Sequence, residues 1–176
     1  MTTNDAGHII RIASRRDAAL LSQLGARAFR EAFGRYIPPM DLHSYISATY
    51  SPARQMDELA NSSMKYFIAE LEGLAVGYAM LHAYEAIPIV TGENPVELKR
   101  IYLLHDFTGR GLGAALMCKC MEASRLCAHK SMWLQVWERN ERAIAFYRKW
   151  GFECVGEISK ELGKSVGRDL IMSGKL

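Results

Sequence analysis

The chain has 176 residues and a formal net charge of +3 at pH 7, with 49% hydrophobic and 23% charged residues. This length fits one domain with a substantial core, and the balance is that of an ordinary globular protein. The basic residues are scattered among acidic ones, which argues against a nucleic-acid partner but is compatible with a small anionic ligand. The sequence shows no secretion signal and no apolar run of about 18 residues, so we expect no export and no membrane partner.

The cysteines carry no metal-binding or disulfide pattern. The four of them are Cys118, Cys120, Cys127 and Cys154, without a Cys-x-x-Cys pair. We therefore predict neither a metal site nor a disulfide framework. Buried free thiols in a reducing cytoplasm are the expected state.

Apolar spacing defines the elements at the start of the chain. It predicts a strand over His8–Ile12 and then a helix that ends near Phe33, because Gly34 follows. Ser14 and Asp17 resemble a capping box at the start of that helix. The opening of the chain is therefore a strand followed by a capped helix.

The next segments are expected to be further helices and a hairpin. Residues 41–61 predict one or two helices, with a new start where Ser51 precedes a proline. Residues 66–71 and 75–82 predict two strands, joined at Glu72-Gly73 by a tight turn.

The centre of the chain is an apolar strand over Val96–Leu104, followed by Thr108-Gly109-Arg110-Gly111-Leu112-Gly113 at the start of a helix. Glycines let a backbone approach a ligand closely, and the unpaired N–H groups of a helix N-terminus attract anions. Residues 108–113 are therefore predicted to form a pyrophosphate cradle. The alternative is that the glycines only make a tight turn.

A dinucleotide site is disfavoured at this loop. That site would need Gly-x-Gly-x-x-Gly and an acidic residue closing the next strand. Here the spacing is Gly-x-Gly-x-Gly, and the strand Met132–Val136 has no acid at its end before Glu138.

The last third of the chain alternates strands and helices. After the loop, one helical stripe is expected to pack on the sheet, and it comprises Leu112, Leu116, Cys120, Ala123 and Cys127. Residues 132–137 predict a strand, and Asn140 is a favourable N-cap for a helix that stops at Gly151. Strands over 152–158 and 166–172, separated by Gly163-Lys164, complete the chain. The order of these predicted strands and helices indicates an α/β (α+β) fold. Such a fold would have one mixed sheet of about seven strands, with helices on its faces.

Two motifs together resemble the GCN5-related N-acetyltransferase (GNAT) superfamily. The first is the loop at residues 108–113, which follows the central strand. The second runs from Asn140 to Phe152 and fits the pattern Asn-x-x-Ala-x-x-Phe/Tyr-Tyr-x-x-x-Gly-Phe. The resemblance covers essentially the whole chain and implies a single N-acetyltransferase domain over residues 1–176, with a mostly antiparallel sheet splayed at its centre. The stretches 97–102 and 135–141 and the chain ending look most like the PaiA branch, bacterial spermidine and spermine acetyltransferases.

The resemblance implies acetyl-CoA as the acetyl donor and a small-molecule amine as the acceptor, and the favoured acceptor is a polyamine. Main-chain groups of Ile101, Tyr102 and Leu103 would pair with the pantetheine arm, and the loop residues Thr108, Gly109, Arg110, Gly111, Leu112 and Gly113 would hold the pyrophosphate. Thr108 departs from the Gln or Arg that is usual there, so we expect a weaker contact at that position. Arg110 either contacts a phosphate or is solvated.

The same resemblance implies Glu97 as the general base and Tyr147 as the general acid next to the coenzyme sulfur, with Asn140 contacting the coenzyme. Each residue has a structural alternative. Glu97 can be a surface ion pair with Lys99 or Arg100, Tyr147 a core tyrosine, and Asn140 only a helix cap.

Two alternatives, and the state of assembly, remain open at this point. The acceptor can instead be a protein N-terminus, a lysine, an amino acid or an antibiotic amine. The domain can also be a non-catalytic acyl-CoA sensor. Dimers are common in the superfamily, so a homodimer is a candidate assembly, with Trp133 and Trp137 in the core or at an interface.

Overall fold

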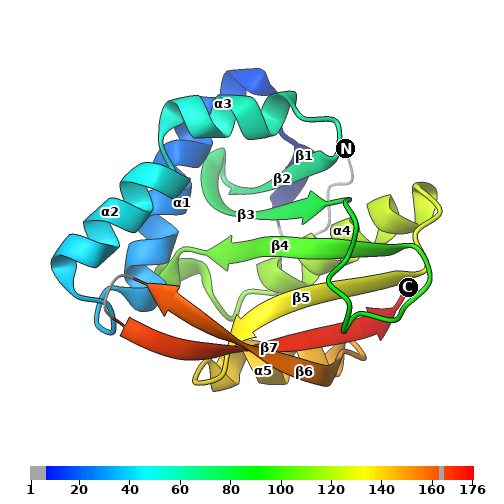
Figure 1. The fold of residues 1–176 in the computed structure, drawn as a ribbon. Coiled ribbons are helices and arrows are strands. Elements are labelled where there is room, and N and C mark those ends of the chain that lie inside the picture. Colours follow the sequence, from blue (N-terminus) through cyan, green and yellow to red (C-terminus); the bar gives the residue numbers. More distant parts are fainter. Residues whose placement is uncertain (1–6, 163–164) are drawn as a thin grey trace. The chain divides into compact units, whose positions relative to one another are not determined.

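The computed structural model describes residues 7–162 and 165–176, which form seven strands and five α-helices (Figure 1). The strand order is β1-β2-β3-β4-β5-β7-β6. Two compact units can be distinguished, Met1–Leu81 with Arg100–Cys120, and His82–Lys99 with Met121–Leu176. Strand β4 (Pro95–Leu103) contributes to both units. The predicted seven-stranded α/β fold is confirmed, and the predicted break at Gly163-Lys164 lies outside the described residues.

The first unit is built on three strands, β1 (His8–Ile12), β2 (Met64–Leu71) and β3 (Leu74–His82, its last residue in the second unit). Strands β1 and β2 pair antiparallel. The turn between β2 and β3 places both Glu72 and Gly73 at positive φ, 51° and 79°. This is the backbone form that a two-residue hairpin requires, so the predicted hairpin is confirmed.

Three helices accompany these strands, α1 (Ala18–Phe33), α2 (Pro39–Thr49) and α3 (Pro52–Ala60) (Figure 1). Both later helices begin at a proline, which suits the first helical position. The Ser51 hydroxyl accepts the amide N–H of Arg54 at 3.3 Å and so caps α3. Before α1, the Asp17 carboxylate accepts the Ser14 amide N–H at 2.7 Å, which is one half of the predicted capping box.

The core of the first unit forms where the apolar side of α1 meets β2 and β3. Aromatic and aliphatic side chains fill it together, because helical spacing on α1 and alternation on the strands direct them to one interior. Its buried members include Leu21, Ala28, Phe29, Tyr50, Ile68, Tyr78 and Met80.

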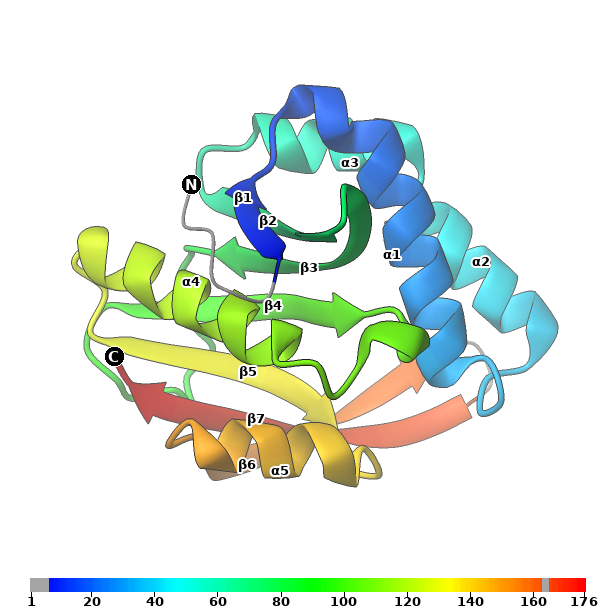
Figure 2. The same cartoon turned by 180° about the vertical axis from the view of Figure 1, so that it is seen from behind.

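The second unit contains β5 (Ser131–Trp137), β6 (Glu153–Leu162), β7 (Ser165–Lys175) and α5 (Glu141–Lys149), and Figure 2 shows α5 along β6 and β7. Strand β7 pairs antiparallel with both β5 and β6. The last two strands are longer than predicted from apolar residues alone. Their ladder continues through Ser159–Arg168 to Leu162–Ser165, since pairing satisfies backbone groups whatever the side chains are.

Helix α4 spans Leu112–Leu126. The predicted stripe is buried at four positions but wrong at Cys127, which is exposed and follows the end of the helix. The expectation of buried thiols is also wrong for Cys118 and Cys154, which are exposed. Cys118 lies two residues before the buried Cys120, and two positions along a helix point to nearly opposite sides. Burial raises the pKa of the Cys120 thiol.

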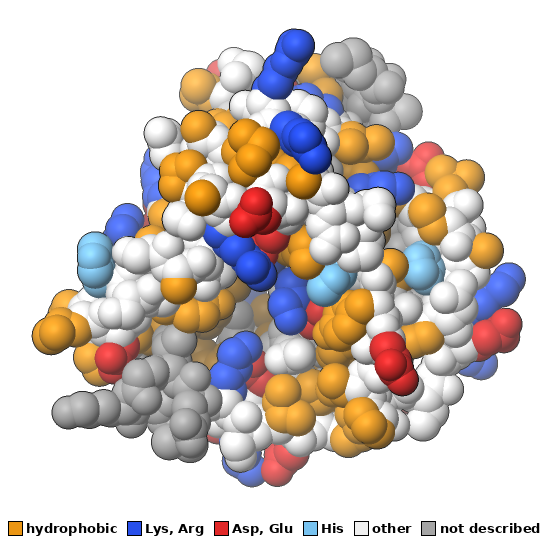
Figure 3. Space-filling model, turned by 45° about the horizontal axis from the view of Figure 1, so that its top comes forward, with side chains coloured by type: hydrophobic (Ala, Val, Ile, Leu, Met, Phe, Trp, Pro, Cys, Tyr) orange, Lys and Arg blue, Asp and Glu red, His pale blue; other side chains and the backbone are white. Residues whose placement is uncertain are grey.

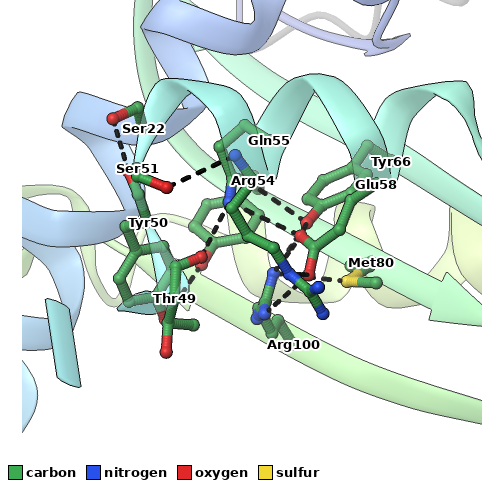
Figure 4. A network of polar contacts seen from close by, with 11 residues as sticks. Ser22, Thr49, Tyr50, Ser51, Arg54, Gln55, Glu58, Tyr66, Met80 and Arg100 are labelled. Carbon is green, nitrogen blue, oxygen red and sulfur yellow. Dashed lines mark hydrogen bonds and ion pairs between the residues drawn. The ribbon is translucent and has the colours of Figure 1, made fainter. Parts of the chain in front are cut away.

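A buried ion pair links α3 to β4 within the first unit (Figure 4). Arg100 donates from Nη1 to Glu58 Oε2 at 2.8 Å and to the Tyr66 hydroxyl at 2.7 Å, and that hydroxyl also bonds to Glu58. Arg54 donates to the other carboxylate oxygen at 3.0 Å. Both oxygens of Glu58 therefore have cationic partners.

The pKa of the Glu58 carboxyl lies below its ordinary value. Burial alone would raise this pKa, but the hydrogen bonds and charge of Arg100 outweigh burial. The lower pKa belongs to the folded state, so the stabilisation is present above the ordinary glutamate pKa of 4.5. It is lost as the pH falls through the folded-state value.

We expect Glu58→Gln to lower the free energy of unfolding by about 3 kcal/mol, because Arg100 is left buried without a counter-charge. Urea unfolding at pH 7 measures this change. Arg54→Met is the matched control, since it removes a partner of the same carboxylate from a side chain that is 54% exposed. It should cost less than about 1 kcal/mol. Equal losses in the two variants would contradict a dominant role for the buried pair.

Candidate active site

The glycine loop in the first unit has the geometry of an anion cradle. A short 3-10 turn (His105–Phe107) precedes it, Gly109 and Gly111 have φ of 79° and 80°, and α4 starts at Leu112. A Cβ built on either glycine would meet no described atom within 4 Å. The two glycines are therefore required by backbone conformation rather than by crowding. The open first-turn amides of α4, with Gly113 among them, are available to an anion.

Hydrogen bonds fix the start of this loop. Glu31 on α1 accepts the amide N–H of His105 at 2.7 Å and the Nε–H of Arg27 at 2.7 Å. Burial would raise the pKa of Glu31, but these two bonds outweigh it and the pKa lies below its ordinary value. The Thr108 hydroxyl donates to the His105 carbonyl at 2.8 Å. Sequence reasoning missed this anchoring role of Glu31, because no local pattern joins residues 74 positions apart.

Arg110 is exposed within the loop, and its guanidinium lies 5.4 Å from the centre of the Phe107 ring. A guanidinium at this distance from an aromatic face is weakly attracted to it. Arg110 therefore stays close to the loop amides while its charge faces solvent.

The other end of β4 in the first unit holds Ile101, Tyr102 and Leu103, all partly buried. The Tyr102 ring packs into the core, 5.9 Å from the ring of Tyr78. The next residue, Leu104, donates its amide to the Val76 carbonyl at 2.9 Å and so holds the strand end to β3. The three residues lie beyond the pairs that β4 makes with β5, which end at Glu97.

Glu97 is buried in the second unit, where it is 1% exposed. It stands opposite Trp133 in the last of three parallel β4–β5 pairs. Lys99 Nζ lies 3.2 Å from Glu97 Oε1, so the predicted ion pair exists, although the carboxylate is not on the surface. Within the described part of the chain, Glu97 Oε2 and Trp133 Nε1 have no hydrogen-bond partner. Trp133 is a core residue of its unit.

Tyr84 is a neighbour of this pair that sequence reasoning missed. It lies in the segment between β3 and β4, with its ring 6.0 Å from Trp133 and 4.3 Å from His82. Burial and the charge of Glu97 raise the pKa of Tyr84. An irregular segment of this kind gives no periodic signal, so only the folded chain reveals this proximity.

Helix α5 carries Asn140 and Tyr147, also in the second unit. The Asn140 side chain accepts the amide N–H of Ala143 at 3.2 Å, which confirms the predicted cap. Tyr147 is buried, with its ring 6.0 Å from that of Phe152. The structure brings Tyr147 and Glu97 into the same unit, and the glycine loop belongs to the first unit.

The described residues hold no group of three or more His, Cys, Asp or Glu side chains arranged to bind a metal ion. None of their helices combines the length and apolarity that crossing a bilayer requires.

Comparison with known proteins identifies the family. Residues 26–152 match the model of the acetyltransferase (GNAT) family. An uncharacterised N-acetyltransferase of Mycobacterium tuberculosis is 33% identical over 160 residues, covering 91% of this chain and 98% of the relative. The chain belongs to the GNAT acetyltransferase family. It is an N-acetyltransferase that uses acetyl-CoA as its acetyl donor.

Two further proteins are similar to this chain. The spermine/spermidine N(1)-acetyltransferase of Bacillus subtilis is 28% identical over 88 residues, 49% of this chain and 58% of that protein. The crystal structure of the PaiA N-acetyltransferase of Thermoplasma acidophilum, solved in complex with coenzyme A, superposes with a TM-score of 0.77. The two sequences are 21% identical, and the match covers 96% of this chain and 99% of the PaiA chain. At this identity the similarity shows a shared fold.

Proposed function

We propose that this GNAT enzyme transfers an acetyl group directly from acetyl-CoA to a primary amine, as a single domain over residues 1–176 in the cytoplasm. The loop from Thr108 to Gly113 holds the pyrophosphate, with Arg110 as an added charge. Main-chain groups of Ile101, Tyr102 and Leu103 pair with the pantetheine arm as a neighbouring strand would. The positive φ of Gly109 and Gly111 supports this assignment, because it turns the backbone into the open end of α4.

Two side chains of the second unit move the protons. A free alkyl amine has a pKa of about 10.4, so a base must take a proton from it at neutral pH. We assign Glu97 as this base and Tyr147 as the acid that protonates the departing thiolate. Asn140 contacts the coenzyme while it caps α5.

The observation that carries this proposal is the half-paired carboxylate of Glu97. A buried carboxylate normally has partners on both oxygens, because an unpaired charge in the interior is costly. Here Lys99 holds Oε1, while Oε2 has no partner among the described residues. An oxygen in this condition is suited to accept a proton in the reaction.

A polyamine is the first acceptor to test. The partial likeness to a spermine/spermidine acetyltransferase supports it. A polyamine would require acidic side chains around an open cleft, and of the candidates Glu31, Asp41, Glu85 and Glu93, Glu31 is already bound to Arg27 and His105. On the face shown in Figure 3, acidic side chains are scattered among basic and hydrophobic ones.

A second candidate is an amine that carries less positive charge than a polyamine, such as an amino acid or a peptide N-terminus. Lys99 favours this candidate, because its ammonium group balances the charge of Glu97 and leaves less attraction for a polycation.

The test of the function is thiol release from acetyl-CoA, measured with spermidine, spermine, a monoamine, an amino acid and a lysine-containing peptide at pH 7.5 and 9. Saturable release with the polyamines alone would support the first candidate. Release with the amino acid or peptide would support the second. Tight acetyl-CoA binding without release on any amine would contradict catalysis and favour the sensor alternative.

We expect Gly111→Ala to weaken acetyl-CoA binding by about tenfold, since a side chain at positive φ distorts the amides of the cradle. Calorimetric titration measures this affinity. Gly73→Ala is the matched control, because Gly73 has a φ of 79° and similarly open surroundings but lies in the β2–β3 hairpin. Both variants should lose similar stability, about 1–2 kcal/mol. Equal affinities in the two would remove the loop assignment.

For Tyr147→Phe we expect kcat to fall by about 10- to 100-fold, because the thiolate loses its proton donor. Acetyl-CoA affinity should change little, since the ring remains in place. Steady-state kinetics and titration separate the two effects. Unchanged turnover would assign Tyr147 to the core alone.

Glu97→Gln should slow turnover at pH 7.5, with a loss that shrinks as the pH rises toward 10. The reason is that the amine then deprotonates without a base. The pH dependence of kcat/KM for both proteins is the measurement. A loss that does not vary with pH would assign Glu97 a positioning role instead.

A further inference from the structure

Burial separates Glu97 from an acceptor that arrives from solvent. The Glu97 side chain is 1% exposed, and Lys99 already occupies one of its oxygens at 3.2 Å. A proton that reaches Oε2 must therefore come through a neighbouring group. This requirement rests on the proposed role of Glu97 as base.

Tyr84 is a partly exposed neighbour of Trp133, the residue that stands opposite Glu97. It is 38% exposed, so part of the side chain is open to solvent. Its ring packs 6.0 Å from the ring of Trp133, which stands opposite Glu97 across the β4–β5 pair. Side chains opposite each other on adjacent strands share one face of the sheet. Tyr84 thus lies over the face on which Glu97 is buried.

The electrostatics agree with this placement. Burial raises the pKa of Tyr84, and the charge of Glu97 raises it further. The phenol therefore stays protonated at neutral pH and can serve as a donor. The His82 ring at the end of β3 lies 4.3 Å from its ring, and Glu97 on β4, which pairs with Lys99, acts on its pKa, while its other ring neighbour, Trp133 on β5, is neutral.

We propose that Tyr84 is a further catalytic residue that carries the proton between the acceptor amine and Glu97. The acceptor ammonium gives a proton to the phenol oxygen while the phenol gives its own proton to Glu97 Oε2. This step leaves Tyr84 neutral, Glu97 protonated and the amine with a free lone pair. The amine nitrogen then bonds to the acetyl carbon and the carbon–sulfur bond breaks, while Tyr147 gives its proton to the thiolate and takes the second proton from the nitrogen.

A double-mutant cycle on the intact enzyme tests this proposal, with the amine that turns over best in the acceptor panel. Tyr84→Phe is expected to lower kcat by about 10- to 100-fold at pH 7.5 and to leave the KM for acetyl-CoA unchanged. Combined with Glu97→Gln, it should cause no further loss, because both residues lie on one proton path. The loss should also shrink toward pH 10.

Two further variants distinguish proton transfer from packing. Tyr36→Phe removes a hydroxyl from another exposed tyrosine, in the first unit, and should leave kcat unchanged. Tyr84→His keeps a ring that can carry a proton and should retain more turnover than Tyr84→Phe. Thermal unfolding of each variant confirms that the fold is intact.

The possible outcomes distinguish failure of the Tyr84 relay from failure of the Glu97 base assignment. If Tyr84→Phe keeps kcat within about twofold while Glu97→Gln is slow, the relay is overturned and the base assignment stands. If the two losses multiply in the double variant, the residues act independently and the relay is also overturned. If Glu97→Gln is fully active, both the base assignment and the relay fail.

Discussion

The cost of burying a carboxylate explains much of this structure. Removing such a charge from water costs several kcal/mol unless cations and hydrogen bonds replace the lost hydration. Glu58 and Glu97 are both buried, 3% and 1% exposed, and they meet this cost differently. Glu58 has cationic partners on both oxygens, Arg100 and Arg54, and so joins α3 to β4. Glu97 has Lys99 on one oxygen only.

The two buried carboxylates therefore differ in role, because Glu58 stabilises the fold and Glu97 is the proposed base. The network around Glu58 lowers its pKa and leaves no oxygen free to accept a proton in a reaction. Glu97 retains an oxygen without a partner among the described residues, opposite an indole N–H in the same condition. Strand β4 takes part in both arrangements, because it carries Arg100, the partner of Glu58, in the first unit and Glu97 itself in the second. Its nine residues therefore serve the stability of one unit and the proposed chemistry of the other.

The glycine loop shows why a departure from the family pattern is tolerated. Backbone amides hold an anion at a helix N-terminus, so the side chain at the first motif position contributes little to the cradle itself. Thr108 uses its hydroxyl within the loop, where it donates to the His105 carbonyl. Glu31 holds the amide of the same residue from α1. The shape of the loop therefore depends on both local and distant contacts.

The sequence alone determined the family, the order of the elements, the helix start at the proline after Ser51 and the cap at Asn140, because these depend on local spacing and on a hydrogen bond between residues three positions apart. It also identified Glu97 as a candidate. Only the tertiary structure decided that Glu97 is buried, that Glu31 anchors the loop and that Tyr84 lies beside Trp133. The exposure of Cys118 and Cys127 was likewise decided there. The physical reason is that burial and long-range contacts depend on which elements pack together, and periodicity along one segment does not record its neighbours.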